Sequence, residues 1–469
     1  MVRRTGKIYL SAALLLLVFL TSAFGQVQTF TEGKYTYTTV EGDPMKTRIY
    51  TLDNGLKVFL TVYKDEPRIQ TYIPVKTGSK NDPSDATGLA HYLEHMLFKG
   101  TDKFGTKDYS KEKPLVDEII GLYEKHRSTT DPKKRKEIYR QIDSVSGLAA
   151  KYAIANEYDK LMADLGASGT NAYTWVEQTV YTNDIPSNQL EKWIMIEAER
   201  FRNPVMRLFH TELEAVYEEK NISLDDDNDK AWDEMFLSLF PTHPYGTQTT
   251  IGTIEHLKNP SIKKVIEYYN ARYIPNNMAI VLSGDLDPEK TIELIDKYWG
   301  SKPSGIVPGF TPPVEKPITK PVVKNVYGPE AEYLMIGYRF PGANTRENDM
   351  ITMVDMVLAN SAAGLLDLNL NQSQKVLGSG SFVMTFKDYS AHMLSGNARS
   401  GQKLEEVKDL LLEQVEKVKN GDFPDWLPEA IINDLRLSEL RGQESNRSRA
   451  DQIVSAFVKD IPWEDQVAR

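Results

Sequence analysis

The sequence contains no cysteine, so disulfide bonds and lipid attachment through a cysteine are both excluded. Basic residues are in the minority, with 56 Lys and Arg against 66 Asp and Glu, which gives a formal net charge of -10. An acidic surface argues against nucleic acid as a partner and mildly favours cationic peptides. Internal repeats and low-complexity tracts are also lacking. A content of 41% hydrophobic and 26% charged residues is typical of a globular chain, here long enough for two domains.

The N-terminus has the pattern of a secretory signal peptide. Three basic residues precede an apolar run over residues 8–20, and Ala23-Phe24-Gly25 provides a small-x-small end. This pattern predicts a signal peptide over residues 1–25 with cleavage before Gln26. The alternative is a membrane anchor, for which the run is short. Export without disulfides is typical of a bacterial periplasmic, cell-surface or secreted protein.

Histidine is scarce, with 7 residues, yet two of them stand in His91-Tyr92-Leu93-Glu94-His95. On a helix each residue turns by about 100°, so positions 91, 94 and 95 fall on one arc about 100° wide. Two imidazoles one turn apart can hold one metal ion, and Glu94 can serve as the base that activates a zinc-bound water. The alternative is a pair of core histidines beside a charged residue.

A catalytic zinc site usually has three protein ligands, so a third must come from another segment. The carboxylate-rich stretch 211–220 is the best candidate region. Glu212 and Glu219 are seven residues apart and share one face of a helix, whereas Glu214 and Glu218 share another. The alternative is an ordinary solvated acidic helix.

Beyond this point the residues resemble a known family. H-x-x-E-H followed far downstream by a helix reading E-x-x-x-V-x-x-E resembles the pitrilysin/insulinase family of zinc peptidases, the inverzincins. Further segments resemble that family in the same order: His95–Thr101, Gly169–Thr174 with Glu177, Thr179 and Tyr181, His243–Gly246 with Ile251–Thr253, and Tyr273–Met278 with Val281–Asp285. The resemblance covers roughly residues 45 to 300.

The resemblance implies a role for each residue of the motif. His91 and His95 are expected to be ligands of one Zn²⁺ in the catalytic domain, and Glu94 is expected to be the general base. When the downstream helix is aligned on Val216, the third ligand is Glu219. The neighbouring Glu218 is excluded only by this register.

Three further residues receive roles from the resemblance. Glu212 becomes a supporting carboxylate of the catalytic site, which holds a ligand or balances the charge of the site. Asn171 and Ala172 are expected on an edge strand that pairs with the backbone of an extended substrate. The alternative for Asn171 is a turn residue.

The resemblance also implies an α+β fold, with two homologous α/β-sandwich-type domains that enclose a chamber. The catalytic domain is expected over residues 45–300 and carries a helical insertion at about 104–164, which reads as a solvated helical hairpin. A Pro-rich linker follows at 301–328. Residues 329–469 are expected to form a homologous, non-catalytic domain that lacks its last helix and strand, so that the sequence is a piece of a longer enzyme.

The sequence therefore predicts a zinc-dependent endopeptidase that hydrolyses peptides or unfolded protein segments. A second family chain, or a missing C-terminal half, is expected to complete the chamber. The alternative is a non-catalytic member that acts as a scaffolding or processing-complex subunit, against which the intact Glu94 argues. Two weaker features have structural interpretations: His243 precedes a proline and is expected to be structural, and Gly378-Ser379-Gly380 reads as a glycine-rich turn.

Overall fold

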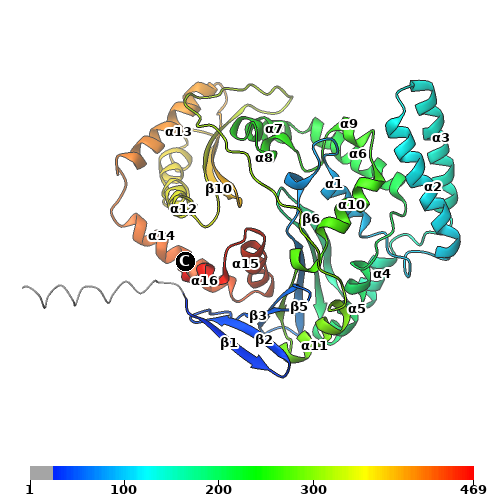
Figure 1. The fold of residues 1–469 in the computed structure, drawn as a ribbon. Coiled ribbons are helices and arrows are strands. Elements are labelled where there is room, and N and C mark those ends of the chain that lie inside the picture. Colours follow the sequence, from blue (N-terminus) through cyan, green and yellow to red (C-terminus); the bar gives the residue numbers. More distant parts are fainter. Residues whose placement is uncertain (1–24) are drawn as a thin grey trace, which may run out of the picture.

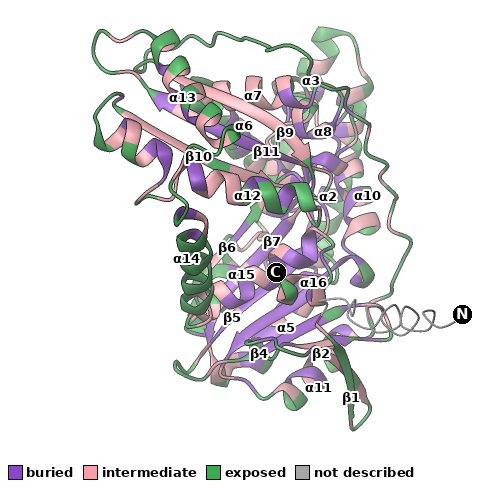
Figure 2. Cartoon of the chain, turned by 90° about the vertical axis from the view of Figure 1, so that its left-hand side faces the viewer, coloured by how far each residue is buried: buried purple, intermediate pink, exposed green. Residues whose placement is uncertain are grey.

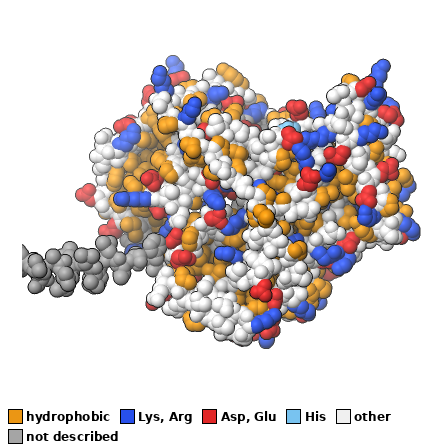
Figure 3. Space-filling view, in the orientation of Figure 1, with side chains coloured by type: hydrophobic (Ala, Val, Ile, Leu, Met, Phe, Trp, Pro, Cys, Tyr) orange, Lys and Arg blue, Asp and Glu red, His pale blue; other side chains and the backbone are white. Residues whose placement is uncertain are grey.

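The computed structural model describes residues 25–469. The predicted signal peptide therefore lies outside the described residues, apart from Gly25. The fold is α+β, as predicted, and contains two β-sheets (Figure 1). The strands of the larger sheet lie between Val27 and Gly284, in the part of the chain called the first half below. Those of the smaller sheet lie between Tyr333 and Asn397, in the part called the second half. Among residues 25–469 no helix combines the length and the apolar character needed to span a bilayer. On the face drawn in Figure 3, acidic and basic side chains are interspersed.

The first half is built on an eight-stranded sheet with the order β1-β2-β3-β4-β8-β5-β7-β6. Its strands are β1 (Val27–Glu32), β2 (Tyr35–Val40), β3 (Arg48–Thr51), β4 (Lys57–Val62), β5 (Arg68–Val75), β6 (Ser168–Thr174), β7 (Thr179–Pro186) and β8 (Ala279–Gly284). Only β4 and β8 run parallel to each other. The fully buried β8 lies inside the sheet, whereas β6 forms one edge.

Alternation along the central strands gives the sheet two apolar faces. On β8, Ile280 and Leu282 join the main core, whereas Ala279 and Val281 join a second core on the opposite face. The main core is covered by α1 (Leu89–Met96), α5 (Leu190–Arg200), α6 (Phe209–Asp225), α10 (Ile262–Arg272) and α11 (Pro288–Trp299). The second core is covered by α15 (Asn446–Val458) and α16 (Trp463–Ala468), which come from the end of the chain (Figure 1).

The segment between the motif and β6 is helical. Helices α2 (Tyr109–Ser128) and α3 (Pro132–Ala149) form the predicted hairpin, which projects at the right of Figure 1 and is followed by α4 (Glu157–Asp164). Both helices start with an aspartate cap: Asp108 accepts from the N–H of Lys111, and Asp131 accepts from two N–H groups at the start of α3. The break between the two helices therefore ends in the capping residue Asp131, and α3 starts at Pro132, as the sequence indicates.

The second half contains a three-stranded antiparallel sheet, β10 (Gly378–Thr385), β11 (Tyr389–Asn397) and β9 (Tyr333–Pro341), in that order. Helices α12 (Arg346–Leu358) and α13 (Leu404–Lys419) cover one face, and α7 (Asp227–Leu239) of the first half covers the other. Helix α14 (Leu427–Gly442) leads back to the first sheet and is largely exposed (Figure 2).

The predicted turn at Gly378-Ser379-Gly380 is wrong, because these residues begin β10. Ser379 pairs with Gly396 of β11, and neither Gly378 nor Gly380 has a positive φ. These two glycines are therefore ordinary strand residues, and close packing requires a glycine only at the partner residue Gly396. A Cβ on Gly396 would lie 2.6 Å from Cγ1 of Val407, so this part of the sheet packs directly on α13.

Candidate active site

The motif helix α1 is held at its N-terminus by a buried carboxylate. Asp82 accepts hydrogen bonds from the N–H groups of Gly88 (2.8 Å), Leu89 (3.2 Å) and Ala90 (3.0 Å). Gly88 has a φ of 84°, and a Cβ there would lie 2.2 Å from the carbonyl oxygen of Ile251, so only glycine fits at this helix start. Three of the N–H groups that the start of a helix leaves without an intrahelical partner are therefore satisfied.

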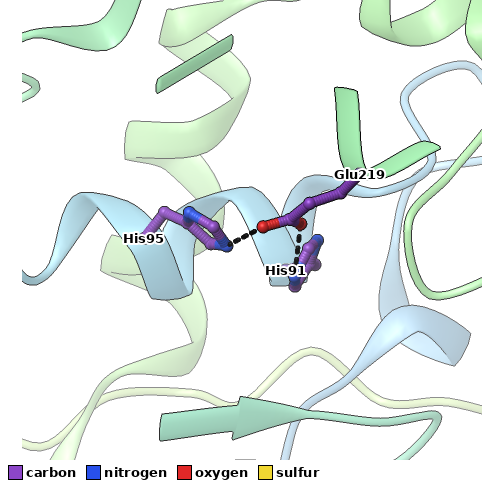
Figure 4. Close-up of side chains that lie close together, drawn as sticks. All are labelled: His91, His95 and Glu219. Carbon is purple, nitrogen blue, oxygen red and sulfur yellow. Dashed lines mark ion pairs between the residues drawn. The ribbon is translucent and has the colours of Figure 1, made fainter. Parts of the chain in front are cut away.

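Three of the predicted site residues meet at one point (Figure 4). His91 and His95 project from α1 toward Glu219, which comes from α6. Nε2 of His91 lies 3.7 Å from Oε2 of Glu219, and Nε2 of His95 lies 3.9 Å from Oε1 of the same carboxylate. The three ligand atoms all lie within 4.8 Å of one another. The neighbouring Glu218, which only the alignment on Val216 distinguished from Glu219, is not part of this group.

This donor set fits a zinc ion. Two imidazoles and one carboxylate are common zinc ligands, and ligand atoms of a tetrahedral site lie roughly 3.3 Å apart. With one ligand atom from each residue the separations reach 4.8 Å, so the three groups must draw together by up to about 1.5 Å around a metal ion. The Glu219 side chain is 43% exposed and can make most of this movement. Within residues 25–469 no other group of three His, Asp or Glu side chains has such spacing.

The imidazoles differ in their electrostatic surroundings. Burial and the neighbouring His95 lower the pKa of His91 to about 4, so His91 is neutral near pH 7, the form that can bind a metal ion. Burial also works to lower the pKa of His95, but the carboxylates of Glu212, Glu219 and Glu94 outweigh it and raise that pKa. In the metal-free site His95 is therefore the imidazole that carries a proton more readily.

Glu94 lies on the same helix but is not part of the ligand group. Its side chain is 8% exposed, and its Oε2 accepts a hydrogen bond of 2.6 Å from the hydroxyl of Thr174 on β6. Burial raises the pKa of Glu94, and the Thr174 hydroxyl opposes this effect. A carboxyl group with a raised pKa next to a metal-binding group is suited to accept and release a proton.

Glu212 lies behind His95. Its Oε2 is 3.5 Å from Nδ1 of His95, and its Oε1 forms a 2.6 Å ion pair with Lys99. Burial works to raise the pKa of Glu212, but the contacts with His95 and Lys99 outweigh it and lower that pKa. Glu212 is thus an anion on the far side of the His95 ring, where a carboxylate fixes the orientation of a ligand imidazole.

Asn171 and Ala172 lie on β6, which is the edge strand of the sheet. They pair with Thr182 and Tyr181 of β7 on one side. On the other side of β6 no strand of residues 25–469 pairs. The strand is therefore open to backbone pairing with an extended peptide.

Some residues of this site have no signal of their own in the sequence. Thr174 and Lys99 touch the site through contacts between segments that are far apart in the chain, whereas Asp82 binds N–H groups six to eight positions later. Residue spacing does not reveal these contacts. Thr174 belongs to a segment that resembles the family, but its contact with Glu94 spans 80 positions of sequence. His243 is fully buried and contacts Asp388 and the N–H of Tyr245, outside the metal-binding group, as expected for a structural histidine.

Comparison with known proteins agrees with this architecture. Residues 58–115 match the model of the insulinase family, peptidase family M16, and residues 261–435 match the model described as the peptidase M16 inactive domain. The zinc protease PqqE of Helicobacter pylori is 21% identical over 424 residues, which cover 88% of this chain and 83% of that protein.

Solved structures share the fold. A protease from Helicobacter pylori superposes with a TM-score of 0.70 at 21% identity, over 88% of this chain and 90% of that one. The first half of the periplasmic protease PqqL from Escherichia coli superposes with a TM-score of 0.61 at 16% identity, over 92% of this chain and 86% of that one. With its matches to both M16 models and the shared architecture, the chain belongs to the pitrilysin/insulinase family of peptidases.

Proposed function

We propose that this chain is a zinc-dependent endopeptidase that hydrolyses peptides or unfolded protein segments. The proposal rests on one observation: ligand atoms of His91, His95 and Glu219 lie within 4.8 Å of one another. The carboxyl group of Glu94 lies on α1, the helix of the two histidines. A purely structural metal site has no use for such a base. The zinc protease named among its relatives supports the same function.

The ligands would be His91, His95 and Glu219, one zinc ion in the catalytic domain, with Glu212 behind His95. Zinc, when bound there, supplies a Lewis acid that polarises the scissile carbonyl and makes water more acidic. Glu94 accepts the proton of the attacking water and delivers it to the leaving amine. Its raised pKa suits both transfers, because the group must take up a proton and then lose it again.

The open edge of β6 would hold the substrate. Backbone groups at Asn171 and Ala172 pair with an extended chain whatever its side chains, which favours peptides and unfolded segments as substrates. The net charge of -10 favours cationic peptides among these substrates. The match to the first half of the PqqL protease supports a second family unit, in the same or another chain, as the partner that completes a chamber.

We propose that the protein is exported to a bacterial periplasm or cell surface. The proposal rests on the basic and apolar pattern of residues 1–25 and on the absence of cysteine. The PqqL protease to which the fold is similar is itself periplasmic.

Glu94→Gln tests the function, because it removes the base and no ligand. The chain from Gln26 onward and its Glu94→Gln variant are purified, bound zinc is measured, and cleavage of a mixed peptide library is followed by mass spectrometry. We expect about one zinc per chain in both proteins, and cleavage by the parent only. Zinc in both proteins with cleavage by neither would contradict peptidase activity of this chain alone and favour the scaffolding alternative. Adding a second family unit and measuring cleavage again would then test that alternative.

A further inference from the structure

The proposed base is held by a hydroxyl on the strand that we propose takes the substrate. Thr174, the last residue of β6, places Oγ1 2.6 Å from Oε2 of Glu94. The same Oγ1 lies 3.4 Å from the hydroxyl of Thr179. A hydroxyl has one hydrogen, and the much shorter contact with a carboxylate takes it. Thr174 is therefore the donor to Glu94.

The position of Thr174 is fixed from both sides. It pairs with Thr179 of β7, and the turn between them is bound by a preceding segment of the chain. The N–H of Ser79 donates to the carbonyl of Trp175 (3.1 Å), and the N–H of Lys80 donates to that of Val176 (3.0 Å). A hydroxyl on a turn held in this way stays in place and orients its acceptor.

Space around this turn is minimal. A Cβ added at Gly78 would lie 2.0 Å from the carbonyl oxygen of Trp175 and 2.7 Å from the N of Glu177. The Glu177 side chain, 7% exposed, is bound by the ammonium of Lys80 at 2.6 Å. Close packing and a buried ion pair together leave the turn no freedom to shift with the base.

We propose that Thr174 is a positioning residue for Glu94, an inference that rests on the endopeptidase function proposed above. Its hydroxyl binds Oε2 of Glu94 and so fixes the rotation of the carboxyl group about its last bond. A catalytic group displaced by about 1 Å loses on the order of 100-fold in rate. Because Asn171, Ala172 and Thr174 share β6, the edge that pairs with substrate and the group that orients the base move as one piece.

The test compares Thr174→Val, Thr174→Ser and the control Thr182→Val in the full zinc-loaded chain, with the peptides that the parent cleaves. Thr182 is a half-buried threonine of the same hairpin whose hydroxyl accepts from Gln70. We expect Thr174→Val to lower kcat roughly 10- to 100-fold, with KM changed by less than about 2-fold and zinc content unchanged, because backbone pairing and the ligands are intact. Thr174→Ser, which restores the hydroxyl, and Thr182→Val should retain kcat close to that of the parent.

Parental kcat in Thr174→Val, while Glu94→Gln abolishes cleavage, would overturn the positioning role and leave the endopeptidase standing. An equal loss in Thr174→Val and Thr174→Ser would also overturn it, because the hydroxyl would then not matter. Cleavage that survives in Glu94→Gln would instead overturn the proposed function. Thr174→Ala replaces the valine variant if the latter does not fold, as judged by circular dichroism and zinc content.

Discussion

Exchange of Glu219 for glutamine tests whether this residue, rather than the adjacent surface carboxylate of Glu218, is the third metal ligand that we propose. Among the side chains of residues 25–469, Glu219 is the only acidic one that approaches both His91 and His95, at 3.7 and 3.9 Å, whereas Glu218 is exposed and outside the group. Both residues lie on α6, so the two variants have the same change of charge and the same helix propensity to within a few tenths of a kcal/mol. Only the position relative to the imidazoles differs.

The magnitude follows from the number of ligands. Apparent zinc-binding free energies of about 10–16 kcal/mol, shared among three protein ligands, give about 3–5 kcal/mol for each. A glutamine keeps a neutral oxygen near the metal position, so part of this is retained and the expected loss is about 3 kcal/mol, which is on the order of 100-fold in Kd.

The assay is competition for zinc with a chromogenic chelator at constant pH and ionic strength. Glu219→Gln should weaken binding by about 100-fold, and Glu218→Gln by less than about 2-fold, since a distant surface charge contributes little. A loss in Glu218→Gln as large as that in Glu219→Gln would refute the argument and shift the register of the third ligand by one residue.

Two predictions concern stability, measured by urea unfolding of the zinc-free protein. Asp82→Ala should lower the free energy of unfolding by about 2 kcal/mol, because it leaves three N–H groups at the start of α1 without their acceptor; a change below about 0.5 kcal/mol would contradict this. For Asp388, His243 and Lys80 outweigh the effect of burial and lower its pKa to about 2. Because this pKa is lower than the unfolded value of 3.8, the Asp388 carboxylate stabilises the fold fully above pH 3.8 and loses this effect as the pH falls through about 2. Asp388→Asn should therefore lower the free energy of unfolding by about 2 kcal/mol at pH 7 and by about half of that at pH 3. A loss that does not depend on pH would contradict the assignment to charge.

The local part of the site follows from sequence. Helical periodicity alone places His91, Glu94 and His95 on one arc, and α1 shows this arrangement. The choice of Glu219 over Glu218 needs the resemblance to the family, because both lie on one acidic helix and spacing does not tell which face meets α1. The contact of Thr174 with Glu94 is set by the docking of β6 against α1, which depends on the packing of the whole sheet.

In the fold, too, features set by nearby residues can be predicted from the sequence, whereas features set by contacts between distant segments cannot. The hairpin of α2 and α3 has its caps and breaker in the sequence. The hairpin of β1 and β2 was not predicted, although aromatic and β-branched residues flank Gly33, which has a φ of 60° at the turn. The position of α15 is the least local feature. Its apolar face is readable at Ile453 and Phe457, but its partner is a sheet whose strands lie more than 160 residues earlier.

The second half has no metal-binding group, yet it contacts the frame of the site through a buried ion cluster. Lys80, which binds the turn after β6, pairs both with Glu177 of that turn at 2.6 Å and with Asp388 of the second half at 3.0 Å. The N–H of Lys387 donates to the other oxygen of Glu177. Buried ion pairs add little net stability, because desolvation offsets their attraction, but loss of one partner leaves the others unpaired and therefore enforces one geometry. The half without a metal site thus helps to hold the turn from which Thr174 reaches Glu94, and a substitution such as Asp388→Asn acts on the frame of the site without contact with any proposed ligand.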